Sequence, residues 1–495
     1  MAKPTLKKIA LYSLGAFSGA LLTLSIQSYA NEQKEVLPVQ SIRTMAEVYG
    51  QIKANYVENK SDDEILEGAM KGMVANLDPH SEYMTLKDYG DLKESTSGEF
   101  GGLGMEIGSE DGFIKVVAPI EDTPAERAGV KSGDIIVKIN EESTRGMTTT
   151  EAVKKMRGKP GTKITLTLSR KDETQPIVVH LTRAIIKVKS VRHHLLEPGY
   201  GYVRITQFQE RTVPSLVESI QALTKENQGS LKGLVLDLRD DPGGLLNGAV
   251  GVSAVFLEHG AKVVSTKGRD KQAGMNLSAV PQDYMMSNSS SDPLIGLPAE
   301  IKNIPVTVLT NSGSASASEI VAGALQDHKR AVIVGTQSFG KGSVQTVLPL
   351  SNGGAVKLTT ALYYTPNDRS IQAQGITPDV EVQDKSRKFE SREADLGGHL
   401  SNPLGGTEVK GNLWQDDTPA KDNAASEAAS APASKEQGAK AETEDKDDIL
   451  SRRIPNPAKD AQLRKALDLI KDPAQWQKSL GLAAKKPAPK KAKAE

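Results

Sequence analysis

The spacing of apolar residues changes along the chain, and each change marks a different kind of segment. Residues 36–96 carry apolar positions at helical spacing. From 97 the pattern turns to short strands separated by glycine turns, and over 199–385 strands alternate with helical stretches. After about 386 the pattern fades. The pattern predicts a multidomain chain of mixed α/β and α+β class.

Residues 1–30 have the order of a secretory signal peptide. Three early lysines precede an apolar stretch over 9–26, and Ser28-Tyr29-Ala30 follows as a small-x-Ala cleavage motif. We expect cleavage after Ala30, with retention as a short inner-membrane anchor as the alternative. Either outcome exports the rest of the chain, which means the periplasm if the cell is Gram-negative.

The N-terminal helical region, 36–96, has two interpretations. Its amphipathic helices can form a cap that packs on the body, or an arm through which copies of the chain form a homo-oligomer. We prefer the cap.

Two mixed segments follow this region. Over 97–184 the strands and one helix, at 148–158, have the length of a small α+β module, and Thr148 and Glu151 form a capping box for that helix. Over 190–385 the alternation of strands and helices predicts a layered α/β core.

The C-terminal part is predicted to be mostly without a core. Residues 386–448 form a disordered linker, because 416–448 contain no Val, Ile, Leu, Met or aromatic residue. A helical segment is predicted over 449–482, centred on 461–470, and a solvated basic tail over 483–495.

Composition narrows the chemistry. The 62 Lys and Arg residues balance 62 Asp and Glu residues, so there is no field of one sign to attract nucleic acid. The absence of cysteine removes disulfides, thiol nucleophiles and thiolate metal sites. The seven His residues show no His-x-x-x-His or Glu-x-x-His spacing, so we expect no metal and no cofactor.

Ser316 stands where a strand gives way to a helix. The apolar strand at 304–310 runs into a turn of small residues at 311–318 and then into an apolar-periodic helix. Small residues let a substrate backbone approach, and the free amides of a helix N-terminus favour an oxyanion. Ser316 is therefore a candidate nucleophile, with a plain serine-rich helix cap as the alternative.

Lys341 is the candidate base for this serine. His328 lies about 18 Å further along the same helix, which is too far. The next strand, 331–335, is about 16 Å long and can return the following loop to the helix N-terminus. There, desolvation and the helix-end potential would have to lower the pKa of Lys341 toward neutrality. Gln345 can accept a hydrogen bond from the amine. Because Ser316, Lys341 and Gln345 would lie together, we prefer a catalytic Lys341 to the alternative of a solvated lysine in a turn.

A second glycine turn ends the motif DLRDDPGG at 237–244. Gly243 or Gly244 can present a backbone amide to an oxyanion, with the amide of Ala317 as the second donor. Phosphate binding is the alternative, but neither a Walker A nor a GxGxxG pattern occurs in the turn.

Together these motifs resemble the carboxyl-terminal processing peptidases, serine peptidases with a Ser-Lys-Gln site. The resemblance covers about 40–385 and rests on SASASEI, SFGKGSVQ, DLRDDPGG and the twenty-five residues from Ser316 to Lys341. LDPHSEYM at 77–84 looks like the N-terminal signature of that family.

The resemblance implies a role for each matching residue. Ser316 would be the nucleophile, Lys341 the general base and Gln345 its orienter. Gly243 and Ala317 would line the oxyanion hole. Asp241 departs from the pattern, because relatives usually carry Asn there.

The same resemblance assigns 97–184 to a PDZ domain and relates the core to a crotonase-like ββα spiral. The loop at 101–105 would bind the C-terminal carboxylate of a substrate through backbone amides, while the chain end adds as a strand beside the helix at 148–158. The binding residues that this implies are Gly102, Leu103, Gly104 and Met105.

These features predict an exported serine endopeptidase that cleaves proteins near their C-termini, with the PDZ domain recognising apolar chain ends. The alternatives are a non-catalytic PDZ adaptor and a crotonase-like acyl-group enzyme. A fluorophosphonate probe that leaves Ser316 unlabelled would favour the adaptor, and acyl-CoA binding would favour the acyl-group enzyme. The sequence leaves open three kinds of interaction: binding to an adaptor lipoprotein, formation of a homo-oligomer, and membrane association through the N-terminal segment.

Overall fold

The computed structural model describes residues 38–110, 112–171, 173–269, 274–286, 289–384, 387, 390–412 and 455–482. The predicted signal peptide, the linker over 413–448 and the basic tail lie outside these residues. Within the described ranges no helix is both long and apolar enough to cross a membrane. The chain divides into two compact units, Met1–Gly72 and Met73–Glu495, which are described separately.

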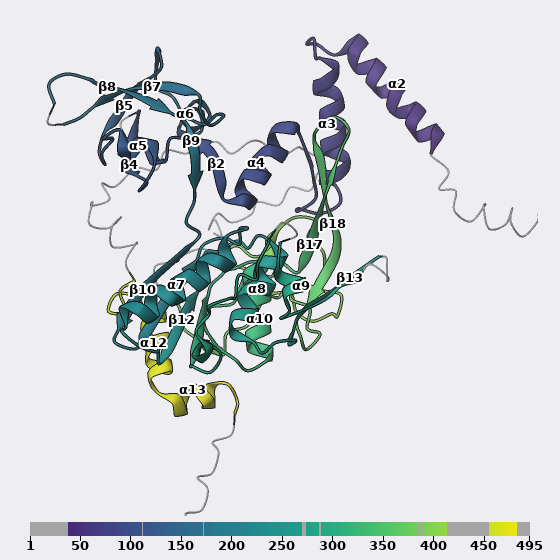
Figure 1. The fold of residues 1–495 in the computed structure, drawn as a ribbon. Coiled ribbons are helices and arrows are strands. Elements are labelled where there is room, and N and C mark those ends of the chain that lie inside the picture. Colours follow the sequence, from purple (N-terminus) through teal and green to yellow (C-terminus); the bar gives the residue numbers. More distant parts are fainter. Residues whose placement is uncertain are drawn as a thin grey trace, which may run out of the picture. The chain divides into compact units, whose positions relative to one another are not determined.

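The first unit contains helix α2 (Val39–Asn55) and most of α3 (Asp62–Ala75), drawn in purple in Figure 1. The apolar residues that predicted α2 lie on its exposed surface, among them Ile42, Met45 and Val48. In the second unit, α4 (Leu86–Ser97) begins at a capping box made by Thr85 and Asp88. The helical pattern read over 36–96 therefore does form helices.

The small α+β module is an antiparallel sheet with two helices. Its strand order is β3-β4-β5-β7-β8, with β6 paired to β5. The capping box predicted at Thr148 and Glu151 opens α6 (Thr149–Met156). The strands and the second helix are β3 (Met105–Glu110), β4 (Phe113–Pro119), β5 (Ile135–Ile139), β6 (Glu142–Ser143), β7 (Lys163–Ser169), β8 (Ile177–Thr182) and α5 (Pro124–Arg127).

A six-stranded sheet forms the centre of the core. Its order is β10-β11-β12-β15-β16-β19, and it is parallel from β11 onward. Every residue of β12, β15 and β16 is buried, as expected for parallel strands covered on both faces. The strands are β10 (Val191–Glu197), β11 (Tyr200–Ile205), β12 (Gly233–Asp237), β15 (Val306–Thr310), β16 (Val332–Gly335) and β19 (Val380–Glu381).

Different helices cover the two faces of this sheet. Leu234 and Leu236 of β12 pack with α7 (Thr212–Glu226), α8 (Leu246–Phe256) and α10 (Ala317–Asp327). Val235, which points the other way, packs with α12 (Ala461–Lys471). Helix α12 confirms the prediction of a helix at 461–470. Figure 1 draws α12 in yellow, together with α13 (Pro473–Ser479).

A second, antiparallel sheet carries part of the candidate site. Its order is β1-β18-β13-β14, and β17 also pairs with β18. The pairing of Tyr83 with Val356 places the LDPHSEYM segment against β18. The strands are β1 (Glu82–Met84), β13 (Lys262–Gly268), β14 (Asn276–Ser278), β17 (Ser343–Pro349) and β18 (Ala355–Tyr364). A further pair, β2 (Glu99–Gly102) with β9 (Ala184–Lys187), frames the α+β module in the sequence.

The structure corrects the predicted start of the linker at 386. Residues 390–412 hydrogen-bond to the core, and Arg392 and Glu393 are buried. Arg392 Nη1 donates to the carbonyl oxygens of Gln337 at 2.8 Å and Ser338 at 2.7 Å. Polar contacts rather than apolar burial hold this segment, so an apolar pattern did not reveal it.

Candidate active site

Ser316 occupies a strained turn between β15 and α10. Its φ of 54° and ψ of −111° lie in a region that non-glycine residues avoid, at a cost on the order of 1–3 kcal/mol. Hydrogen bonds hold the turn in this shape: Ala315 N donates to Asp241 O at 3.0 Å, and Ser314 Oγ to Leu238 O at 2.7 Å. Ser316 thus lies at the predicted junction of strand and helix, where it is half-buried.

The buried carboxylate of Glu319 organises both sides of the site. Its Oε2 accepts the backbone amides of Ser316 and Lys341, each at 2.9 Å. Its Oε1 accepts the amide of Gly340 at 2.7 Å and the hydroxyl of Ser338 at 2.6 Å. Burial raises the pKa of Glu319 to about 7, although these four donors favour the ionised form. Sequence reasoning missed this role; the S-x-x-E spacing of a capping box at 316–319 was the available signal.

Lys341 lies where the strand lengths predicted. Because β16 runs parallel to β15, the loop after it arrives at the edge of the sheet where α10 begins. Lys341 Nζ donates to Gln345 Oε1 at 2.5 Å. Burial lowers the pKa of Lys341 to about 8, while the charge of Glu393 acts in the opposite direction.

The candidate nucleophile and the candidate base line one cavity of about 870 Å³. Among the described residues, no hydrogen bond joins Ser316 Oγ to Lys341 Nζ; the lysine amine is held by Gln345. The hydroxyl of buried Tyr363 donates to the carbonyl oxygen of Lys341 and so fixes the lysine backbone. Apolar side chains form much of the remaining wall: Phe208, Leu245, Leu246, Leu277, Ile320 and Val344.

The glycine turn differs from the implied arrangement in one respect. The amide of Gly243 donates to Asp241 Oδ1 at 2.9 Å, so it is not free for an oxyanion. A Cβ at Gly243 would lie 2.9 Å from Ser316 Cβ, so the turn packs too closely on the serine for any side chain. Gly244, which the sequence left open, lines the cavity together with Ala317. Within the described part of the chain, neither of these two amides has a hydrogen-bond acceptor.

Asp241 is buried behind this turn. Burial raises the pKa of its carboxyl to about 7, partly offset by the hydrogen bond from the Gly243 amide. Its Oδ2 has no hydrogen-bond partner among the described residues. The residue that departs from the family pattern is therefore a carboxyl whose ionised form is destabilised.

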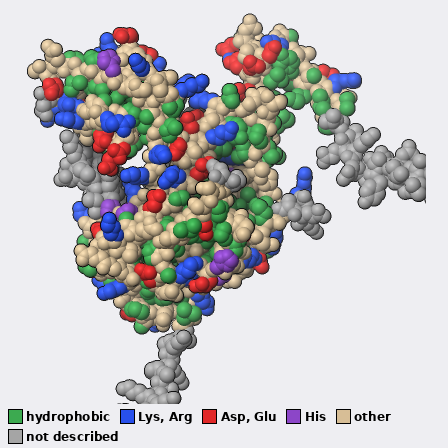
Figure 2. All heavy atoms as spheres, in the orientation of Figure 1, with side chains coloured by type: hydrophobic (Ala, Val, Ile, Leu, Met, Phe, Trp, Pro, Cys, Tyr) green, Lys and Arg blue, Asp and Glu red, His purple; other side chains and the backbone are tan. Residues whose placement is uncertain are grey.

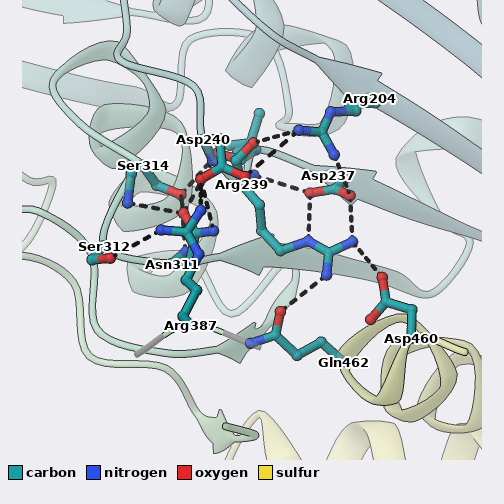
Figure 3. A network of polar contacts seen from close by, with 12 residues as sticks. Arg204, Asp237, Arg239, Asp240, Asn311, Ser312, Ser314, Arg387, Asp460 and Gln462 are labelled. Carbon is teal, nitrogen blue, oxygen red and sulfur yellow. Dashed lines mark hydrogen bonds and ion pairs between the residues drawn. The ribbon is translucent and has the colours of Figure 1, made fainter. Parts of the chain in front are cut away.

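A network of charges ties the C-terminal helix to the same turn (Figure 3). Arg239 donates to both oxygens of Asp237, at 3.0 and 2.7 Å, to Asp460 Oδ2 at 2.8 Å and to Gln462 Oε1 at 3.0 Å. On the other side of the turn, Arg387 pairs with Asp240. The contacts of Arg239 with Asp460 and Gln462 could not be predicted from the sequence, because these partners lie more than two hundred residues away along the chain.

The predicted loop of the α+β module lines a groove. Gly102, Leu103, Gly104 and Met105 face a cavity of about 140 Å³ together with Val153, Met156 and Arg157 of the α6 region. The groove lies between a glycine loop and a helix, which is where we predicted from the sequence that a substrate C-terminus binds.

Charged side chains of both signs mix on the face drawn in Figure 2, and the described residues hold no cluster of metal ligands. Figure 2 shows basic and acidic side chains interspersed over the described part of its face, in line with the balanced counts. The residues that the structure describes include no group of three or more His, Asp or Glu side chains placed to hold a metal ion.

Comparison with known families matches three parts of the chain. Residues 199–382 match peptidase family S41, 115–170 match the PDZ domain, and 14–87 match the N-terminal domain of the activating protease CtpB.

Similar proteins cover more of the chain. A carboxy-terminal-processing protease of Bartonella bacilliformis is 44% identical over 402 residues, which are 80% of this chain and 88% of that protein. The carboxy-terminal processing protease CtpA of Bacillus subtilis is 35% identical over 336 residues, 68% of this chain and 67% of that protein. Among solved structures, a photosystem II D1 C-terminal processing protease is 29% identical, with a TM-score of 0.38, covering 67% of this chain and 85% of that one.

These matches define a serine peptidase that carries a PDZ domain. The chain belongs to peptidase family S41, and within it to the C-terminal processing proteases.

Proposed function

We propose that this peptidase is an exported endopeptidase that cuts proteins near their C-termini with Ser316, Lys341 and Gln345. The observation that carries the proposal is that Ser316 and a buried Lys341 line one cavity while one carboxylate, Glu319, binds both of their backbone amides. A lysine with a pKa of about 8 is neutral often enough near neutral pH to act as a base.

The chemistry follows from these positions. Neutral Lys341 Nζ takes the proton of Ser316 Oγ as the oxygen bonds to the substrate carbonyl carbon. The lysine ammonium returns that proton to the leaving amine as the C–N bond breaks. Water then attacks the ester carbonyl carbon and gives a proton to Lys341. As the C–O bond to Ser316 breaks, the lysine ammonium returns this proton to Ser316 Oγ, and the new C-terminus is released.

The oxyanion needs donors that are not already engaged. We assign this role to the amides of Ala317 and Gly244, since both residues line the cavity and Gly243 is bonded to Asp241. Gly243 then keeps the turn close to Ser316. The N-terminus of α10 adds its positive potential at the same point.

Substrate selection is assigned to the PDZ groove. A chain end with an apolar last side chain suits the groove lined by Leu103, Met105 and Val153, with the carboxylate on the loop amides. The relation of the core to crotonase-like ββα spirals remains part of this proposal.

Export, membrane association, an adaptor lipoprotein and a homo-oligomer belong to the proposal as well. The order of residues 1–30 supports export, and the exposed apolar surface of α2 supports a partner for that helix. Cell fractionation with N-terminal sequencing tests export and cleavage after Ala30. A mature N-terminus elsewhere, or retention in the cytoplasm, would contradict it.

The catalytic proposal is tested with Ser316→Ala and Lys341→Ala on an unfolded protein that has an apolar C-terminus. Both variants should lose cleavage, whereas the matched controls Ser351→Ala and Lys329→Ala, at exposed positions, should keep it. A fluorophosphonate probe should label Ser316. Normal turnover by either active-site variant would refute the assignment.

A further inference from the structure

The orientation of the Gln345 carboxamide decides what Lys341 can do. Gln345 Oε1 accepts from Lys341 Nζ at 2.5 Å, and this leaves the lone pair of a neutral amine free for the Ser316 proton. If the carboxamide turned over, its N–H would donate to the amine and occupy that lone pair. Something on the other side of Gln345 must therefore select one orientation.

Two hydroxyl groups face the other side of Gln345. Its Nε2 donates to Ser343 Oγ at 3.0 Å and to Thr359 Oγ1 at 3.2 Å. A hydroxyl with a free proton can accept from an amide N–H or donate to an amide oxygen, so it does not discriminate. A hydroxyl whose proton is already engaged can only accept.

Thr359 is a hydroxyl of the second kind. Its Oγ1 donates to Asp78 Oδ1 at 3.0 Å, and an ionised carboxylate has no proton to offer in return. With that proton engaged, Thr359 Oγ1 accepts from Gln345 Nε2 and would repel Gln345 Oε1. Each hydrogen bond therefore points the same way, with the donor nearer Lys341: Lys341 donates to Gln345, Gln345 to Thr359, and Thr359 to Asp78.

Hydrogen bonds from its own loop hold the Asp78 carboxylate in place. Its Oδ1 also accepts the amides of His80 at 2.8 Å and Ser81 at 2.9 Å, and its Oδ2 accepts from Ser81 Oγ at 2.7 Å. Burial raises the pKa of Asp78, but these hydrogen bonds outweigh it and hold the pKa below its ordinary value. Ser81 Oγ in turn accepts the amide of Thr359 at 3.0 Å.

We propose that Asp78 and Thr359 are positioning residues of the peptidase, which hold the Gln345 carboxamide with its oxygen toward Lys341. This inference rests on the proposed function of Ser316, Lys341 and Gln345 and deepens it. In this proposal the LDPHSEYM segment supplies the Asp78 carboxylate, which is the final acceptor in this chain of hydrogen bonds.

The test replaces Thr359 and measures kcat against pH. Thr359→Val removes the acceptor and is expected to lower kcat by about tenfold, part of the roughly 10²–10⁴ that a general base contributes. Thr359→Ser keeps the hydroxyl and should restore most of the loss. Thr360→Val is the matched control, because Thr360 is exposed and its side chain lies on the other face of β18.

The pH profile separates positioning from loosening. A turned carboxamide donates to the amine and favours its neutral form, so the acidic limb of the Thr359→Val profile should move to lower pH. A loosened site would admit water and move the limb toward higher pH. The charged groups that act on Lys341 are unchanged in the Thr359 and Thr360 variants: Glu393, Lys357, Glu319 and Asp78.

A double-mutant cycle tests whether the effect passes through Gln345. Thr359→Val should cost nothing further in a Gln345→Ala background, and Asp78→Ala should add little to Thr359→Val. If Ser316→Ala and Lys341→Ala lose cleavage but Thr359→Val behaves like Thr360→Val, the positioning role is wrong and the catalytic assignment stands. If Ser316→Ala or Lys341→Ala retains cleavage, the catalytic assignment itself is wrong.

Discussion

The backbone amide of Lys341 donates to the carboxylate of Glu319 at 2.9 Å, across twenty-two residues of sequence. The same carboxylate oxygen accepts the amide of Ser316. One buried side chain therefore sets the distance between the backbone of the nucleophile and that of the base. The positions of the two reacting groups depend on a carboxylate that is hydrogen-bonded to three backbone amides and the Ser338 hydroxyl.

Glu319→Gln should reduce activity and stability together. The carboxamide can accept on one side only, so amide donors now bound by Glu319 would lose their partner in a buried site. We expect kcat to fall by at least about tenfold. Steady-state kinetics and thermal unfolding measure both effects, with Glu381→Gln, at an exposed position of β19, as the control. An unchanged kcat would separate Glu319 from the geometry of the site.

Activity should rise with pH through the pKa of Lys341, which lies near 8. The base must be neutral, so below that pH the rate should fall about tenfold for each unit, as the ammonium form takes over. Lys341→Arg should be inactive across the range because the guanidinium stays protonated. A rate that is flat between pH 6 and 9, measured in a range where the fold is intact, would contradict this assignment.

Asp241→Asn should change how stability depends on pH. The folded state raises the pKa of Asp241 from 3.8 to about 7, so it holds a proton that the unfolded chain loses. Its contribution to stability is full below pH 3.8 and is lost as pH rises to about 7, at about 1.4 kcal/mol for each unit. The variant should therefore gain more stability over the parent protein at pH 8 than at pH 5. Urea unfolding of both proteins at the two pH values measures this difference. Equal effects at the two values would be inconsistent with a raised pKa.

Asp460→Ala should weaken the attachment of α12. The carboxylate pairs with Arg239 at 2.8 Å in a partly buried network, so its removal should cost roughly 1–2 kcal/mol of unfolding free energy. Asp468→Asn, on the exposed side of the same helix, should cost little. Chemical denaturation of the full chain compares the two. If both variants matched the parent protein, the network in Figure 3 would carry no stability.

Val153→Lys should weaken recognition of apolar chain ends. The residue lines the PDZ groove, where a charged side chain would lose hydration against an apolar ligand. KM for a protein with an apolar C-terminus should rise while kcat on a short peptide stays the same. Lys154→Ala, exposed on the same helix, is the control. Equal KM values for the two variants would place chain-end recognition elsewhere.

Local patterns predicted the parts of the site that depend on element lengths. The lengths of β15, α10 and β16 were enough to return Lys341 to the N-terminus of the helix, because parallel strands end at one edge. Glu319 was missed because its four donors come from two separate loops. Asp78 belongs to the recognisable LDPHSEYM motif. Its contact with Thr359 could not be predicted, because it depends on the pairing of β1 with β18. The segment at 390–412 is held by a few buried polar residues, among them Arg392, Glu393 and Asn402, and has no apolar period, so no apolar pattern could place it.

Labelling of Ser316 by a fluorophosphonate, followed by peptide mass mapping between pH 5 and 10, tests the central assignment most directly. We expect a single adduct on Ser316. Its rate of formation should rise with pH through an apparent pKa of about 8, and the adduct should be lost in Lys341→Ala. An adduct on another residue, or labelling of Ser316 at the same rate with and without Lys341, would contradict it.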